Sequence, residues 1–323
     1  MSFNEEDQIY RKYMYRLNGQ VTEEKLDYYN GILREFEALT NQTFELQAQY
    51  ERGEITAQEL QFQLEVQNSY SKRISGFQQV QDDMEYILRL QAQGIDAYFL
   101  DKLTAKAYFE TSSMELKNAA VFMAAVILCI SALYSSDIRK NMLPLLKSTP
   151  NGRGALVWSK YLWALVTVLI LYAAVYVPYY IYVYRNVGAL PLAAPVQSVR
   201  NFQRFGGSMT IAGLFVLRHC FAIMNALTAA AIVVALSVRL KNRVLSMIVS
   251  TALICVPLLL QSRGIELRWF SMNNAFLLLH TLTDPNALAK VVAQQAVIAA
   301  IGVVCVLATL SSFDALPRRR ARR

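Results

Sequence analysis

Long apolar runs, each close to the length of a membrane-spanning helix, dominate the last two thirds of the chain. A transmembrane helix needs about 20 apolar residues, because it rises about 1.5 Å per residue through a hydrocarbon core about 30 Å thick. Residues 117–323 are therefore predicted to form a five-span transmembrane domain in an all-α, polytopic membrane protein. The predicted spans are approximately 119–135, 161–184, 214–238, 244–260 and 290–310.

The third run contains two polar side chains near its start, Arg218 and His219. An Arg at the bilayer centre costs about 2.5–3.5 kcal/mol on insertion scales. We therefore expect both residues to lie near a membrane interface.

In residues 1–116 the apolar positions recur with the periodicity of amphipathic helices. Apolar residues three or four positions apart predict one buried helix face: Leu26, Tyr29, Leu33 and Phe36. Gly53 interrupts this pattern, and Thr56 with Glu59 three residues later predicts a capping box at the start of a second helix. An acidic helical-hairpin domain is therefore expected over residues 1–116.

Charge is distributed unevenly between the two parts. Residues 1–116 contain 11 Lys/Arg and 20 Asp/Glu, whereas residues 117–323 contain 21 Lys/Arg and 4 Asp/Glu. The basic residues of the second part form short clusters between apolar runs, which is typical of membrane-protein loops and not of nucleic-acid-binding domains. The expected partner is a lipid bilayer, and no nucleic acid is expected to bind.

The basic residues in the connecting segments predict the orientation. The segment 136–160, the segment 239–243 and the C-terminal tail together carry 13 Lys/Arg, and the opposite loops carry 5. Cytoplasmic loops are enriched in Lys and Arg. The first set is therefore predicted to be cytoplasmic, and residues 1–116 extracytoplasmic, in a multi-pass protein of the cell membrane.

The sequence contains no recognisable set of catalytic, cofactor-binding or metal-binding residues. The phosphate-binding motif GxxxxGK[ST] is absent. His219 and His280 are far apart and lack further ligands at metal-site spacing. The four cysteines lie in apolar runs, where we interpret them as small apolar residues: Cys129, Cys220, Cys255 and Cys305. The chain is therefore not expected to be an enzyme.

The first predicted cytoplasmic loop carries motifs in a characteristic order. It begins with Asp137, continues with an apolar cluster and Ser148-Thr149-Pro150, and ends with Gly152-Arg153 and Lys160. This order resembles the signature of the permease subunits of type 2 ABC exporters. Five further segments are similar to a Gram-positive subgroup with a helical extracytoplasmic domain: 13–25, 53–56, 194–202, 236–242 and 256–257.

The resemblance implies an exporter of two membrane subunits and two separate cytoplasmic ABC ATPase subunits. ATP and Mg²⁺ would bind the ATPase, so no cofactor is expected in this chain, and the second permease subunit would be the same chain or a paralogue. The residues implied in coupling lie in the first cytoplasmic loop: Asp137, Met142, Leu143, Leu145, Leu146, Lys147, Pro150, Gly152 and Arg153. The second cytoplasmic loop contributes three basic residues: Arg239, Lys241 and Arg243.

Two alternatives stay open at this point. The loop 136–160 is also readable as a solvated basic connector, although its apolar cluster favours contact with a partner or a membrane. The alternative function is a non-transporting sensor or scaffold whose extracytoplasmic helical domain binds a ligand or partner. The family has six spans and five are counted here, so we expect a first span to be missing from this chain.

Overall fold

The computed structural model describes residues 5–109, 113–139, 152–205, 207–240, 242–262 and 287–314. These residues are mostly helical. They form two compact units, each built from more than one chain segment. The first unit comprises Met1–Tyr108, Asn186–Gln203 and Gly207–Ala212. The second unit comprises Phe109–Arg185, Arg204–Gly206 and Gly213–Arg323.

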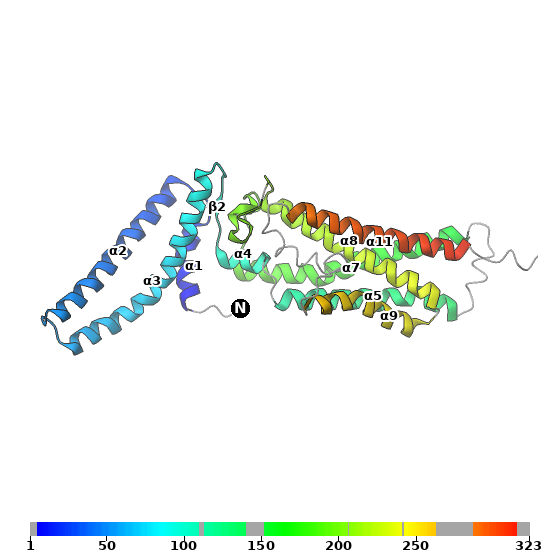
Figure 1. Ribbon diagram of the computed structural model, residues 1–323, viewed down its shortest axis with the longest axis horizontal. Coiled ribbons are helices and arrows are strands. Elements are labelled where there is room, and N and C mark those ends of the chain that lie inside the picture. Colours follow the sequence, from blue (N-terminus) through cyan, green and yellow to red (C-terminus); the bar gives the residue numbers. More distant parts are fainter. Residues whose placement is uncertain are drawn as a thin grey trace, which may run out of the picture. The chain divides into compact units, whose positions relative to one another are not determined.

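Helices of very different length make up the N-terminal part of the first unit: α1 (Glu5–Leu17), α2 (Glu23–Glu51), α3 (Ala57–Ala92) and α4 (Lys102–Phe109). Figure 1 shows α2 and α3 as two long helices that are connected where α2 ends and α3 begins. Two short strands pair antiparallel near the other end, β1 (Gly19–Gln20) with β2 (Tyr98–Phe99). This pairing joins the chain entering α2 to the chain leaving α3.

The core of the first unit is shared by α1, α2 and α3. Tyr10, Met14 and Leu17 of α1 are almost completely buried, and α1 packs more extensively on α3 than α2 does. Phe36 of α2 stacks on Phe77 of α3 with ring centroids 4.2 Å apart. Each large apolar side chain buried in this way stabilises the fold by about 1.5–3 kcal/mol. The core therefore has three helical contributors, including one that precedes both long helices.

The connection between α2 and α3 follows the predicted turn and cap. Helix α2 ends at Glu51, and Gly53 has a φ of +75°, which glycine adopts without the steric cost paid by other residues. The Thr56 hydroxyl accepts a hydrogen bond from the Glu59 backbone N–H, and the Glu59 carboxylate accepts one from the Thr56 backbone N–H at 2.9 Å. This reciprocal pair confirms the predicted capping box.

The segments Asn186–Gln203 and Gly207–Ala212 belong to the first unit although they follow the second predicted span. The first of them contains two 3₁₀ turns, η1 (Val196–Ser198) and η2 (Arg200–Phe202). The backbone N–H of Tyr98 donates a hydrogen bond to the Ser198 hydroxyl at 2.9 Å. This hydrogen bond connects η1 to β2.

The second unit is a bundle of long helices: α5 (Ser113–Arg139), α7 (Gly152–Val187), α8 (Ile211–Leu240), α9 (Arg243–Ser262) and α11 (Ala287–Asp314). Helix α5 packs on α9. Most of the apolar stretch of α8 is buried, whereas α7 and α11 expose most of theirs. Helix α8 therefore lies inside the bundle, and the apolar surface of α7 and α11 needs an apolar environment.

Three helices are long and apolar enough to cross a membrane: Gly154–Val187, Ile211–Leu240 and Leu288–Ser312. They contain the predicted spans 161–184, 214–238 and 290–310, as expected of a multi-pass membrane protein. The other two predicted spans fall in α5 and α9. Their described apolar portions, Val121–Leu133 and Arg243–Ile254, are shorter.

Candidate functional site

Most of the predicted coupling loop lies outside the described residues. This applies to Met142, Leu143, Leu145, Leu146, Lys147 and Pro150. The backbone of Asp137 lies in the last turn of α5, and Gly152 and Arg153 begin α7. The structure thus describes the two helices that flank the loop.

These flanking helices are tied to each other close to the loop. The Lys160 ammonium group, in the third turn of α7, donates a hydrogen bond of 2.7 Å to the backbone oxygen of Leu133 in α5. Leu133 lies six residues before the end of α5. A charge-assisted hydrogen bond in an apolar bundle is stronger than a neutral one. A specific polar contact therefore connects α5 and α7 near the two ends of the loop.

The second predicted cytoplasmic loop lies where α8 ends at Leu240 and α9 begins at Arg243. Arg239 and Arg243 lie on either side of it and are exposed, and Lys241 lies outside the described residues. The Asn242 side-chain oxygen accepts hydrogen bonds from the backbone N–H groups of Val244 and Leu245, at 3.0 and 3.3 Å. Asn242 therefore caps α9 and leaves the two arginines at the surface.

A buried hydrogen bond also connects α8 and α9 near this connection. The hydroxyl oxygens of Ser237 in α8 and Ser246 in α9 are 3.0 Å apart and hydrogen-bonded, and both side chains are buried. Hydrogen bonds of this kind between helices contribute about 0.6 kcal/mol on average in a membrane. Helices α8 and α9 are therefore joined both by a short connection and by a buried polar contact.

A column of aromatic side chains runs along α7. Tyr172, Tyr176 and Tyr180 follow at intervals of four residues and stack, with centroids 4.5 and 6.4 Å apart. The hydroxyl of Tyr172 is hydrogen-bonded to Nδ1 of His219 in α8. Phe122 of α5 lies edge-on to Tyr172 at 5.5 Å. The column thus brings side chains of α5, α7 and α8 into contact.

Arg218 and His219 of α8 pack against other protein groups, and their location near a membrane interface stays a prediction. Arg218 is only 2% exposed and is among the largest fully buried side chains of the described chain. His219 lies within the aromatic column. The bundle therefore encloses these two residues with protein groups, which their position in the sequence did not indicate.

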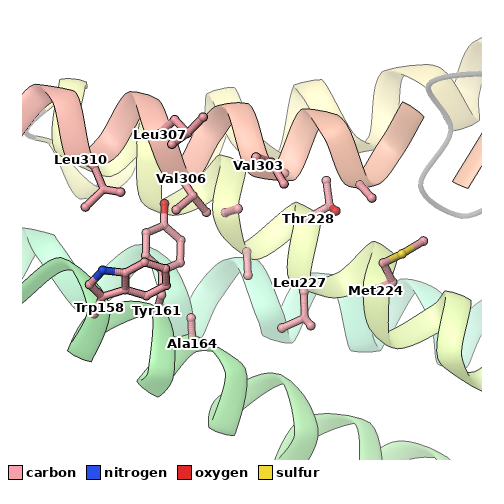
Figure 2. A pocket seen from close by; sticks show the side chains of 14 residues that line it. Trp158, Tyr161, Ala164, Met224, Leu227, Thr228, Val303, Val306, Leu307 and Leu310 are labelled. Carbon is pink, nitrogen blue, oxygen red and sulfur yellow. The ribbon is translucent and has the colours of Figure 1, made fainter. Parts of the chain in front are cut away.

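An apolar cavity of about 450 Å³ lies between α7, α8 and α11 (Figure 2). Trp158 and Leu310 lie at one end, and Met224 and Thr228 at the other. The Tyr161 hydroxyl at its wall is hydrogen-bonded to the Thr309 hydroxyl at 3.0 Å. Small-molecule sites have volumes of roughly 300–1,000 Å³. The cavity is therefore large enough for the apolar part of a ligand.

Chemically, this arrangement is suited to binding and mechanical coupling. In the ranges that the structure covers, no three His, Cys, Asp or Glu side chains lie together as metal ligands. Sequence reasoning missed both the aromatic column and the cavity. The four-residue spacing of Tyr172, Tyr176 and Tyr180 is a signal for the first, whereas a cavity between helices leaves none.

Comparison of the chain with protein-family models, with curated proteins and with solved structures finds no match.

Proposed function

We propose that this chain is the membrane-spanning permease subunit of an ATP-driven ABC exporter. A separate cytoplasmic ATPase subunit would bind the loop 136–160 and supply ATP and Mg²⁺. A second permease subunit, identical or paralogous, would complete the pathway. The proposal rests on the apolar helices of the second unit and on the order of motifs in this loop.

The single observation that carries the coupling role is the contact between Lys160 and the Leu133 backbone oxygen. A loop whose two ends are tied together moves as one body with its flanking helices. Rigid-body movement of this kind is how transporters pass a change at one site to their spans. A free basic connector would need no such contact between α5 and α7.

The proposed topology has five spans, with α5 and α9 as the two that complete the set. The exposed Arg239 and Arg243 at the α8–α9 connection then face the cytoplasm under the positive-inside rule. The first unit, with its α2–α3 hairpin, lies on the extracytoplasmic side of the cell membrane in this proposal.

The alternative function is a membrane sensor or scaffold that transports nothing. Its support is two exposed aromatic side chains of α2 and α3, Phe44 and Phe62, which are 70% and 69% exposed. Contiguous exposed apolar patches mark interaction sites, so this alternative requires the two rings to belong to one patch. In this alternative the pair would contact a partner outside the cell.

The deciding experiment uses the apolar cluster of the loop. The full chain is expressed with a cytoplasmic ABC ATPase, solubilised and captured, and ATP hydrolysis is measured in the captured material. Replacing Leu145 and Leu146 together with Asp puts charge into an apolar contact, so we expect the ATPase to be lost.

Lys140→Ala is the matched control within the same loop. Exposed ion pairs contribute about 0.2–1 kcal/mol, so this variant is expected to keep most of the ATPase. Membrane insertion is checked for every variant. Equal retention of the ATPase by both variants would make the loop a connector and would favour the sensor or scaffold.

A further inference from the structure

Two carboxamide side chains are buried inside the second unit with all their polar atoms unpaired within the described residues. Asn225 of α8 is 0% exposed and Gln295 of α11 is 2% exposed. Neither the oxygen nor the nitrogen of either amide has a hydrogen-bond partner there. Buried polar groups of native proteins are nearly always hydrogen-bonded, so such a pair calls for a partner.

Both residues belong to the seam between α8 and α11. These two helices run in the same direction along the bundle (Figure 1). The Thr228 hydroxyl donates a hydrogen bond of 3.4 Å to the backbone oxygen of Ile298. Asn225 lies three residues before Thr228, and Gln295 three residues before Ile298. Residues three apart share one face of a helix, so both amides are on the contact face at the same level.

The apolar cavity stops about one helical turn short of these amides, which are not part of its lining. Its lining includes Met224, which directly precedes Asn225, and Ala299, one turn after Gln295. Its opposite end is at Trp158 (Figure 2). An elongated ligand in the cavity would therefore have one end next to the layer of the two amides and the other at the indole ring.

We propose that Asn225 and Gln295 form a polar subsite for an uncharged hydrogen-bonding group, and that the cavity holds the apolar chain attached to it. Each amide both donates and accepts and carries no charge, which matches a carboxamide or a hydroxyl. Arg218 lies two turns before Asn225 on the same face of α8 and is buried, which disfavours a cationic group at this site.

The ligand is thus an amphipathic molecule with a neutral polar head, such as an acyl amide. This assignment rests on the proposed function, because it names the class of molecule that the exporter would accept. Its test uses neither the ATPase nor transport, so its failure would leave the coupling proposal standing.

The probe is 16-bromohexadecanamide, whose bromine quenches indole fluorescence on contact. Trp163 and Trp269 are replaced with Phe, so that Trp158 is the one remaining tryptophan. The full chain is placed in lipid nanodiscs and titrated with the probe. We expect saturable quenching of Trp158. Ala299→Phe, which fills the cavity, is expected to abolish the saturable part.

The matched variant is the double replacement Asn225→Leu and Gln295→Leu. Loss of the polar contacts is expected to raise the half-quenching concentration of the amide probe by about tenfold. The headless probe 1-bromohexadecane should quench both proteins equally. The double variant should unfold at the same temperature as its parent or higher, because it removes unpaired buried groups.

Equal half-quenching concentrations of the amide probe in the parent and the double variant would overturn the proposal. So would saturable quenching that persists in Ala299→Phe, because the probe would then bind elsewhere. A double variant that unfolds at a clearly lower temperature would identify the two amides as a structural pair between helices, which also contradicts the subsite.

Discussion

The hydroxyl of Tyr86 donates a hydrogen bond of 2.6 Å to the backbone oxygen of Gln197, 111 positions later in the chain. The bond is buried and joins α3 to η1 within the first unit. Burial raises the pKa of Tyr86 to about 12, so the hydroxyl keeps its proton at neutral pH. One side chain thus connects the long N-terminal helices to a segment that follows α7.

Tyr86→Phe removes this donor and leaves the ring in place. The Gln197 oxygen then lacks that partner, and we expect a loss of about 1–3 kcal/mol in the stability of the segment. Faster amide hydrogen exchange over residues 196–202 is the measurement. Tyr15→Phe, at a side chain 89% exposed, is the control and should exchange as the parent does. Unchanged amide exchange in Tyr86→Phe would show that this hydrogen bond does not stabilise the segment.

The capping box at α3 gives an acid-sensitive element. Hydrogen bonds from the Thr56 backbone N–H and hydroxyl lower the pKa of Glu59 below its usual value. A group with a depressed pKa in the folded state stabilises the fold above its unfolded pKa, and this contribution is lost as the pH falls through the folded pKa.

Glu59→Gln should therefore weaken the pH dependence of thermal unfolding in the acid range, below the ordinary pKa of a glutamate. Unfolding followed by circular dichroism from neutral to acid pH is the measurement. Glu35→Gln, an exposed position within α2, serves for comparison. Parallel pH profiles for Glu59→Gln and the parent protein would contradict the prediction.

Helices α8 and α11 approach closely at Gly302. A Cβ atom there would lie 2.9 Å from the Thr228 hydroxyl oxygen, whereas a Cβ at Gly154 of α7 would have no neighbour within 4 Å. Small residues allow this approach of membrane helices. Gly302→Leu should therefore lower the free energy of unfolding by about 1–3 kcal/mol through overpacking. Gly154→Leu should not lower it, and equal losses from both changes would show that the approach is unimportant.

The proposed orientation is tested with single cysteines. In a chain whose four native cysteines are replaced with Ser, a cysteine at the exposed Gln61 should react with a membrane-impermeant maleimide on intact cells. A cysteine at the exposed Arg243 should react only after lysis. The reverse pattern would invert the assigned topology.

Span location and the capping box could be predicted from the sequence, because each depends on neighbouring residues. Hydropathy over about 20 positions locates α7, α8 and α11, and a Thr followed three residues later by Glu is a local cap signal. The packing of Tyr10 and Met14 on α3 depends on contacts distant in the chain, and it was not anticipated.

The candidate site was largely beyond sequence reasoning for the same reason. Asn225 and the pair Gln294-Gln295 lie in apolar runs far apart in the sequence, and only the parallel course of α8 and α11 places Asn225 and Gln295 at one level of the seam. The cavity arises from the volumes left between three helices, which no periodicity encodes. The coupling role of the loop 136–160 stays a prediction.

The divided chain of the first unit has a consequence for biosynthesis. Its N-terminal helices leave the ribosome before α5, α7 and the segments Asn186–Gln203 and Gly207–Ala212 that complete the unit. At about 5–20 residues per second, this interval is on the order of ten seconds. During that time the Gln197 oxygen that Tyr86 will contact does not yet exist. The first unit is therefore completed only after α5 and α7 have been synthesised.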